Sequence, residues 1–361
     1  MSPKPSILLL SPYPWGAAPS QRFRYEHYLE EEKEVTHAPF WSAKSWNRLY
    51  DSGNWGHKIA GLMGGFLRRL LLLRHLHRYE CVYIHREATP LGPPIFEWLI
   101  AKVWRKPIIY DFDDAIWLPN TSRENRWVAW LKWHGKVKWI CRWSRIVSCG
   151  NTYLAAYARE YARDVRVIPT VVDTRHAHNR LKDQRQGRVV VGWTGSHSTL
   201  PYLQPLLPVL QELERELEFE TVVIANKDPQ LALQHYRFVP WNKATEIDDL
   251  LQLHIGLMPL EDSAWTRGKC GFKAIQYMAL GIPALVSPVG VNPQIVTQGE
   301  QGFHCVQPAD WKRYLRQLIQ DADLRSRLGQ AGRARVQEKY SVAATRPAFQ
   351  QLLQDASSSR R

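Results

Sequence analysis

The sequence has few cysteines and no long apolar run, and each shortage excludes a class of protein. Its five cysteines are scattered at positions 81, 141, 149, 270 and 305, and none forms a Cys-x-x-Cys pair. This odd, dispersed set fits a reducing compartment and argues against a disulfide framework or a zinc site. No stretch approaches the roughly 20 apolar residues that cross a bilayer, and the apolar run at 7–10 is too short for a signal peptide. We therefore expect a cytoplasmic protein without a transmembrane helix or a bound metal.

Acidic residues are scarce relative to basic ones. The chain has 48 Lys and Arg against 34 Asp and Glu, for a formal net charge of +14. Such an excess predicts an anionic partner, and three kinds fit: nucleotide phosphates, nucleic acid or an acidic membrane surface. Charge alone does not choose among them, so the choice depends on motifs.

Short apolar runs that alternate with helical stretches are abundant. With 361 residues, of which 45% are hydrophobic, the chain can bury two medium-sized cores. The runs fall into two series, and short runs of this kind are typical of parallel sheets covered by helices on both faces. The predicted fold is α/β, with two doubly wound, Rossmann-like domains. The predicted strands are 7–10, 81–84, 107–110, 145–148 and 165–168, then 189–191, 221–224, 255–258 and 284–286.

A polar segment at 174–187 separates the two series. It lacks apolar periodicity and ends at Gly187, just before the second series begins. We place an N-terminal domain at 1–173 and a C-terminal domain at 188–340. Residues 341–361 are expected to form a final helix followed by a disordered tail.

The most informative stretch, 267–290, combines a glycine-containing loop, a helix and a strand. A helix that starts near Gly271 would direct free N–H groups and its positive dipole end at an anion. If that helix extends back to Lys269, then Lys269, Lys273 and Gln276 share one face. Two cations and an amide on one face suit a diphosphate and a ribose. An ordinary surface helix with solvated lysines would explain the same pattern, so further motifs have to decide.

This stretch resembles the donor-site signature of retaining, nucleotide-sugar-dependent glycosyltransferases of family 4. The usual pattern has two glutamates eight residues apart, and here Gly268 and Gln276 occupy those positions, in a Gly-Lys-Cys-Gly-Phe-Lys version carried by one branch of the family. Stretches 110–117, 191–199 and 255–260 fit the same branch, so the resemblance spans nearly the whole chain. It implies the GT-B architecture, in which two Rossmann-like domains face a cleft. By this resemblance, 1–173 is the acceptor-side domain, 188–340 is the nucleotide-sugar-binding domain, and the helix in 341–361 crosses back to the first domain. The two departures concern the contacts to sugar hydroxyls.

The resemblance also implies an activity. The expected enzyme is a hexosyltransferase-type glycosyltransferase (EC 2.4) that moves a sugar, with retention, from a UDP- or GDP-sugar to a glycan or lipid-linked acceptor. The nucleotide sugar is a substrate, and neither a cofactor nor a metal ion is expected, because fixed cations and helix N-termini can stabilise the leaving diphosphate. No protein nucleophile is expected either.

Two loops of small residues add to the expected donor site. They follow the predicted strands at 7–10 and 189–191, where ligands of doubly wound sheets bind, and their backbone N–H groups could approach a phosphate. Arg22 and Arg24 follow the first loop and are expected to place guanidinium groups near it. The expected donor-binding residues are Gly16, Gly195, Ser196, Thr199, Arg267, Lys269, Lys273 and Gln276.

Charged residues at the ends of two predicted strands form the expected acceptor side. Asp111, Asp113 and Asp114 lie within four residues, which is a costly cluster unless it serves a function. Arg86, at the end of the preceding predicted strand, is a candidate partner for them. By the resemblance, Asp113 takes the place of a histidine that many relatives present to the transferring sugar. The expected catalytic residues are Asp113, Arg86 and Lys273, with Asp111 or Asp114 as a structural partner.

Two basic segments leave the location and the function class open. Residues 61–76 form a basic amphipathic stretch, and residues 126–143 interleave tryptophans with cations. Such helices lie readily at an anionic membrane interface, so a peripheral position on the inner membrane face is a further expectation. A catalytically silent GT-B protein, which would bind nucleotide sugars or scaffold a partner, is the first alternative, because both glutamates are replaced. A single-stranded nucleic-acid-binding protein is the second, but without a known signature for it no nucleic acid partner is expected.

Overall fold

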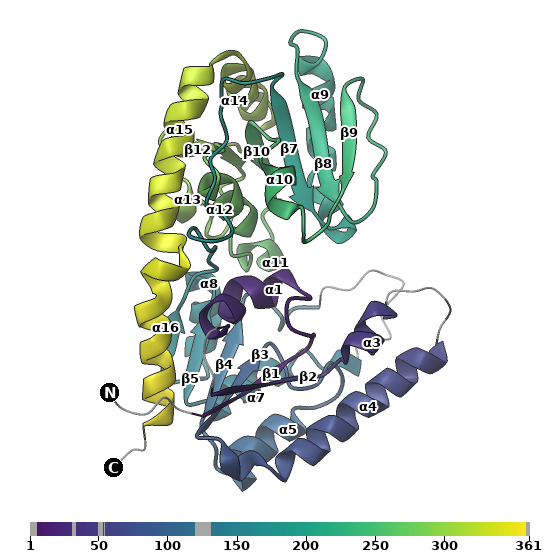
Figure 1. Ribbon diagram of the computed structural model, residues 1–361, viewed down its shortest axis with the longest axis vertical. Helices are drawn as coiled ribbons and strands as arrows, with labels where there is room; N and C mark the ends of the chain where they lie inside the picture. The colour runs from purple at the N-terminus through teal and green to yellow at the C-terminus, as the bar shows by residue number, and fades with distance from the viewer. Residues whose placement is uncertain (1–5, 31–33, 50–52, 54, 120–130, 359–361) are drawn as a thin grey trace. The chain divides into compact units, whose positions relative to one another are not determined.

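Two α/β units make up the computed structural model, which describes residues 6–30, 34–49, 53, 55–119 and 131–358. The first unit comprises residues 1–170 and 345–361, and the second comprises residues 171–344. Each unit contains a six-stranded sheet whose strand pairs are parallel, with helices packed on it (Figure 1). The predicted α/β class with two parallel sheets is confirmed.

The first sheet has the strand order β2-β1-β3-β4-β5-β6. Its strands are β1 (Ile7–Ser11), β2 (Val35–Pro39), β3 (Cys81–His85), β4 (Ile108–Phe112), β5 (Ile146–Cys149) and β6 (Val165–Val167). The helical segments are α1 (Pro19–Gln21), η1 (Arg22–Glu26), α2 (His27–Leu29), α3 (Ala43–Asn47), α4 (Trp55–Leu73), η2 (Leu76–Arg78), α5 (Ile95–Trp98), η3 (Leu99–Val103), α7 (Lys136–Trp143), α8 (Thr152–Arg159) and α16 (Val342–Ser357). In β3 and β4, His85 is level with Asp111, so the charged residues that follow both strands emerge side by side.

The second sheet has the strand order β12-β11-β10-β7-β8-β9. Its strands are β7 (Val190–Gly195), β8 (Glu220–Ala225), β9 (Tyr236–Pro240), β10 (Ile255–Met258), β11 (Ala284–Val286) and β12 (Gly302–His304). The helical segments are η5 (His197–Tyr202), η6 (Gln204–Leu206), α9 (Leu207–Leu213), α10 (Glu246–Leu250), α11 (Ala264–Arg267), α12 (Phe272–Ala279), α13 (Asn292–Ile295), α14 (Pro308–Gln320), α15 (Ala322–Arg335) and η7 (Val336–Tyr340).

All nine predicted strands are present, and three strands are additional. The additional strands are β2, β9 and β12, and each lies at an edge of its sheet. An edge strand has one neighbour and buries less apolar surface, so its sequence pattern is weaker. The partly exposed β2 and β9 illustrate this, whereas the central strands β1, β3 and β4 are buried along their whole length.

The division between the units falls earlier than the predicted polar segment. Residues 174–187 belong to the second unit because they are tied to it by hydrogen bonds. Arg333 donates to Thr174 O at 3.0 Å, and the buried Gln184 donates to Gly281 O at 3.0 Å. The predicted boundary at 173 and 188 therefore shifts to 170 and 171, since polar side chains anchor this segment in place of apolar ones.

Helix α16 packs on the first unit from Thr345 onward. Thr345 Oγ1 lies 2.6 Å from Tyr28 Oη, and the Phe349 and Tyr28 rings stack with centroids 4.2 Å apart. The helix continues to Ser357, the residue at which the predicted tail begins. Residues 359–361 of that tail lie outside the described residues.

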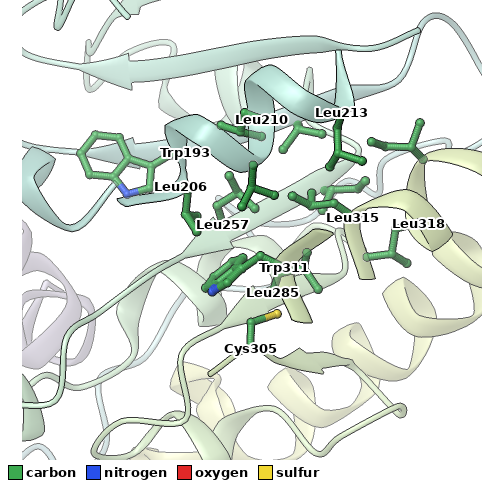
Figure 2. Packing of buried hydrophobic residues seen from close by; sticks show 14 of the residues in the cluster. Trp193, Leu206, Leu210, Leu213, Leu257, Leu285, Cys305, Trp311, Leu315 and Leu318 are labelled. Atoms are coloured by element: carbon green, nitrogen blue, oxygen red, sulfur yellow. The ribbon is translucent and has the colours of Figure 1, made fainter. Parts of the chain in front are cut away.

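The core of the second unit lies between its sheet and the helices α9, α14 and α15. Leu210 and Leu213 from α9 and Leu315 and Leu318 from α14 are buried in one cluster. Figure 2 shows Trp193, the aromatic residue of β7, at the opposite end of this cluster from Leu318. The Trp193 ring lies against the end of β7 and the loop that follows it, because a Cβ on Gly195 would lie 2.4 Å from this ring.

Candidate active site

Helix α12 begins in the loop that the sequence singled out. Gly271 is its N-cap and has a φ of 67°, in the left-handed region that favours glycine. A Cβ at this position would lie 2.0 Å from Ile295 Cδ1, so another residue would displace the loop or α13. The predicted helix start near Gly271 is confirmed.

Lys273 is the strongest candidate for holding an anion. Its side chain is partly buried, and its ammonium group lies 4.8 Å from the centroid of the Trp193 ring. Burial, together with the charge of Lys269, lowers the pKa of Lys273 to about 7. Within the described residues no carboxylate forms an ion pair with Lys273. A partly buried cation without a counterion is suited to an anionic ligand.

Lys269 and Arg267 precede α12 and do not share its face. The Lys269 N–H donates to Thr266 O at 3.0 Å in the turn after α11, and its ammonium group lies 5.1 Å from the Trp265 ring centroid. The expected common helix face therefore holds only Lys273 and Gln276, because the left-handed Gly271 interrupts the helix. Arg267 forms an exposed ion pair with Asp262, with Nε and Oδ1 2.6 Å apart.

Two buried donors at this site lack partners. Gln276, one turn after Lys273, is 2% exposed, and its Nε2 has no hydrogen-bond partner. Trp193 Nε1 is likewise buried and unpaired. An unsatisfied buried donor costs about 1–3 kcal/mol, so both groups would gain from a ligand that accepts hydrogen bonds.

Trp193 and Asn292 are candidate site residues that sequence reasoning missed. Trp193 lies in the loop predicted after the strand at 189–191, and nothing in the sequence marks it as the platform for Lys273. Asn292 Oδ1 is buried without a partner and would lie 3.3 Å from a Cβ on Gly271. Its Nδ2 donates to Ser287 O at 2.9 Å, which fixes the side chain beside the start of α12. An asparagine after the strand β11 is the signal that could have found it.

The loop after β7 is compact and closed by its own hydroxyls. Ser196 N–H donates to Thr199 Oγ1 at 3.1 Å, and Thr199 Oγ1 also lies 3.0 Å from Ser196 O. A Cβ on Gly195 would lie 2.4 Å from the Trp193 ring, so this glycine is needed for the loop to fold over the tryptophan. The expected diphosphate role of Gly195, Ser196 and Thr199 stays a prediction, and the Ser196 N–H is engaged within the loop.

The predicted carboxylate cluster is organised by Arg86. Its Nε donates to Asp113 Oδ1 at 2.8 Å, and Nη2 donates to Asp114 Oδ2 at 2.7 Å. Burial alone would lower the pKa of Arg86, but the two carboxylates outweigh it and raise the pKa above its ordinary value. Arg86 has a φ of 61°, which is unusual for a residue with a side chain and is typical of functional positions.

Asp111 is buried and has a different role from the two carboxylates that follow it. Arg24 forms an ion pair with it, and His85 Nδ1 lies 2.8 Å from its Oδ2. All three side chains are almost completely inaccessible to solvent. Arg24 also donates to Ser148 Oγ at 3.2 Å, so it joins β4 and β5 to the helical segment after β1. The Arg24 guanidinium thus pairs with a carboxylate inside the unit, and the expectation that it lies near the loop after β1 stays a prediction.

The loop after β1 is held by a carboxylate. Gly16 has a φ of 71°, and its N–H donates to both oxygens of Glu26, at 2.9 and 3.0 Å. Glu26 is buried, and Gln21 accepts from the Tyr13 N–H at 3.0 Å. The Glu26 carboxylate would repel a phosphate at this place. A donor-binding role of Gly16 stays a prediction, and this arrangement counts against it.

Among the described residues, no group of three or more His, Cys, Asp or Glu side chains is arranged to hold a metal ion. Arg86 pairs with Asp113 and Asp114, and Arg24 and His85 pair with Asp111.

The chain is similar to known glycosyltransferases in sequence over one segment. Residues 228–335 match the model of the family described as glycosyl transferases group 1. This segment runs from before β9 to the end of α15 and includes Gly271, Lys273 and Gln276. No curated protein sequence matches the chain significantly.

Solved structures share the fold over most of the chain. HepE from Anabaena, in complex with UDP, is 15% identical, with a TM-score of 0.69 over 97% of this chain and 100% of that one. A glycosyltransferase from Rickettsia africae is 12% identical, with a TM-score of 0.67 over 97% of both chains. Sucrose-phosphate synthase from Thermosynechococcus elongatus is 15% identical, with a TM-score of 0.60 over 81% of this chain and 78% of that one. At these identities the likeness shows the GT-B fold alone.

The family match and the fold point to one class of enzyme. The match falls on the unit that contains the unpaired Lys273, and the two parallel sheets are those of the GT-B fold. The protein is therefore a glycosyltransferase with the GT-B fold, and its residues 228–335 match the group 1 family.

Proposed function

We propose that the protein is a retaining glycosyltransferase of family 4 that uses a nucleotide sugar without a metal ion or a cofactor. The single observation that carries the proposal is Lys273, a partly buried cation over Trp193 that lacks a counterion among the described residues. It lies in the first turn of α12, where free N–H groups and the helix dipole also attract an anion. A nucleoside diphosphate would supply the negative charge that balances Lys273 at the start of α12.

The chemistry follows from where charge develops. As the sugar leaves, negative charge grows on the diphosphate, and Lys273 with the start of α12 stabilises it without reorganisation. Lys269 adds a second positive charge, which supports a metal-independent reaction. The positive charge on the sugar is stabilised by the leaving phosphate on the same face, so the acceptor attacks from that face and the configuration is retained. Asp113, held by Arg86, would orient the sugar or the acceptor.

The donor is proposed to be a UDP- or GDP-sugar and the acceptor a glycan or a lipid-linked sugar. HepE, which shares the fold, is described in complexes with UDP and with UDP-glucose, and this favours uridine first. Gln276 would bond to the ribose hydroxyls where other members use a carboxylate. A lipid-linked acceptor would place the enzyme in the cytoplasm, peripherally at the inner membrane face.

A screen of UDP-, GDP-, ADP-, CMP- and dTDP-sugars tests the proposal. Bound donors should raise the melting temperature, and one of them should be hydrolysed slowly without acceptor, with an α-linked donor giving an α-configured product by NMR. Turnover should persist in excess EDTA. Binding without hydrolysis or transfer to any acceptor would instead favour a catalytically silent nucleotide-sugar-binding protein, the alternative suggested by Gly268 and Gln276.

Lys273→Ala is expected to weaken nucleoside diphosphate binding by about 10- to 150-fold, since a charge-assisted contact contributes about 1.5–3 kcal/mol. Isothermal titration with UDP and GDP measures this loss. The exposed Lys243 of the same unit provides the matched control, and Lys243→Ala should leave binding unchanged. Unaltered affinity in a folded Lys273→Ala variant would mean that the diphosphate does not bind at this site.

The pH dependence of the same titration separates Lys273 from a structural role. With a pKa of about 7, the free side chain loses its charge as the pH rises through neutrality. A bound diphosphate raises that pKa, so binding above about pH 7 takes up a proton and weakens as the pH increases. Lys273→Ala should abolish this proton uptake.

Gln276→Glu is expected to keep or improve donor binding, whereas Gln276→Leu should weaken it by about 1–3 kcal/mol. The leucine has a similar volume but leaves the ribose hydroxyls without a partner. Donor affinity and turnover of the two variants, measured side by side, give the comparison. Normal turnover of the leucine variant would make Gln276 a packing residue.

A further inference from the structure

Helix α4 is packed with its apolar side outward. The buried positions are Gly61, Gly65 and Arg69, spaced four residues apart on one face. On the opposite side Trp55 is 73% exposed and Met63 is 63% exposed. The other large apolar residues of this outer stripe are Ile59, Leu67, Leu70 and Leu71. An amphipathic helix of a soluble protein normally faces its core with such a stripe.

The inward face of α4 explains why this orientation is fixed. Arg69 donates to three backbone oxygens, to Ala88 O at 2.8 Å, to Ala38 O at 2.7 Å and to Ser11 O at 3.0 Å. A Cβ on Gly65 would lie 2.5 Å from the Phe40 ring, so only glycine allows this close approach. The hydrogen bonds and the close packing together hold the glycine side inward and the apolar side outward.

The neighbouring segment extends the exposed apolar surface. Helix α5 lies beside α4, with the Phe66 and Phe96 rings 6.3 Å apart (Figure 1). Four large apolar residues of α5, η3 and the turn after them are at least 39% exposed. They are Ile95, Trp98, Val103 and Trp104. We call the exposed apolar residues of α4 together with these four the α4–α5 face.

The charges around the α4–α5 face are positive. Residues 55–79 contain five Lys or Arg, of which only Arg69 is buried, and no Asp or Glu. Residues 95–106 contain Lys102, Arg105 and Lys106, and their one carboxylate, Glu97, is completely buried. The Lys58 ammonium lies 5.8 Å from the Trp55 ring centroid at the start of the stripe. Two copies of this face would repel each other, whereas an anionic lipid surface complements both its apolar and its basic parts.

We infer that the α4–α5 face docks the protein on an anionic membrane surface, with α4 lying in the plane of the interface. The apolar stripe would enter the boundary between headgroups and acyl chains, with tryptophans at the level where they are favoured. The lysines and arginines would contact the lipid phosphates. In the described part of the chain no helix is long and apolar enough to cross a membrane, so α4 would lie on the surface. This inference does not depend on the identity of the donor or on the reaction.

Co-sedimentation with vesicles tests the inference. Wild-type protein should bind vesicles of 70% phosphatidylcholine and 30% phosphatidylglycerol at least about tenfold more tightly than pure phosphatidylcholine vesicles, and salt should weaken this binding. Met63→Glu/Leu67→Glu should reduce binding to the anionic vesicles by more than about tenfold. The control is Val306→Glu in the second unit, an apolar residue that is more exposed than Met63 or Leu67, and this variant should bind as the wild type does.

Two further measurements make the outcome decisive. Both variants alter exposed side chains, so their circular dichroism and melting temperature should equal those of the wild type. Retained vesicle binding by the folded double variant would overturn the inference. Absence of wild-type binding, combined with dimers that the double variant loses in analytical ultracentrifugation, would also overturn it and assign the face to a second copy of the chain.

Discussion

Asp111→Asn is expected to lower the free energy of unfolding of the first unit by about 3–5 kcal/mol, because it removes the charge of a buried carboxylate that pairs with the buried Arg24 guanidinium. Neither side chain is more than 1% exposed, so water cannot replace the lost carboxylate. Arg24 also donates to neutral oxygens of Ser148 and Ile168. The asparagine keeps the shape of the side chain, which isolates the effect of charge.

Hydrogen exchange of the strand amides in the first sheet is the appropriate measurement, because a chain of two units need not unfold in one transition. The partly exposed pair of Arg166 and Asp164, 2.8 Å apart, provides a control in the same unit. Asp164→Asn should cost less than about 1 kcal/mol. Similar losses in the two variants would mean that the buried pair contributes no more than a surface pair.

The same pair predicts how the unit responds to acid. Burial alone would raise the pKa of Asp111, but Arg24 and His85 outweigh it and hold the pKa well below its ordinary value of 3.8. A lowered carboxyl pKa stabilises the fold above that ordinary value, and the contribution is lost as the pH falls through the folded pKa. Between about pH 5 and about pH 2 the wild type should therefore lose more stability than Asp111→Asn.

Asp113→Asn should lower kcat by about 100- to 1000-fold while changing donor affinity little, if the carboxylate acts chiefly in the transition state. Asp113 is partly accessible and is held by Arg86 through a 2.8 Å hydrogen bond, so it is oriented and still able to meet a ligand. Steady-state kinetics together with donor titrations separate kcat from binding.

Asp114→Asn is the matched control, because Asp114 bonds to the same guanidinium group at 2.7 Å. It should act mainly on stability. Equal losses of kcat in the two variants would indicate that the pair only positions Arg86. A loss in Asp113→Asn that follows donor affinity alone would move the acceptor-side chemistry to Arg86.

Elements with strong local signals could be predicted from the sequence. The buried central strands carry continuous apolar runs, and Gly271 marks the start of α12. The pairing of Arg86 with the carboxylates also followed from adjacent parallel strands. In these cases the pattern reports a local conformation or a neighbour fixed by the sheet.

The sequence could not predict the direction in which individual side chains point. Arg24 could face the loop after β1 or the interior, and only the position of Asp111 in the folded unit decides. Trp193 is a large apolar residue of the kind found in cores, yet its ring also contacts the Lys273 ammonium group. Residues 126–130 of the tryptophan-rich segment lie outside the described residues, so their expected contacts remain predictions.

The packing of α4 on Phe40 through Gly65 has a consequence for the kinetics with which the α4–α5 face would associate with an anionic membrane. Because the glycine leaves no room for the helix to rotate, the outer stripe has its final geometry before any encounter. Association then carries no cost of ordering a segment. Its rate should be set by diffusion and by long-range attraction between opposite charges, so it should fall with ionic strength and show no slow conformational phase.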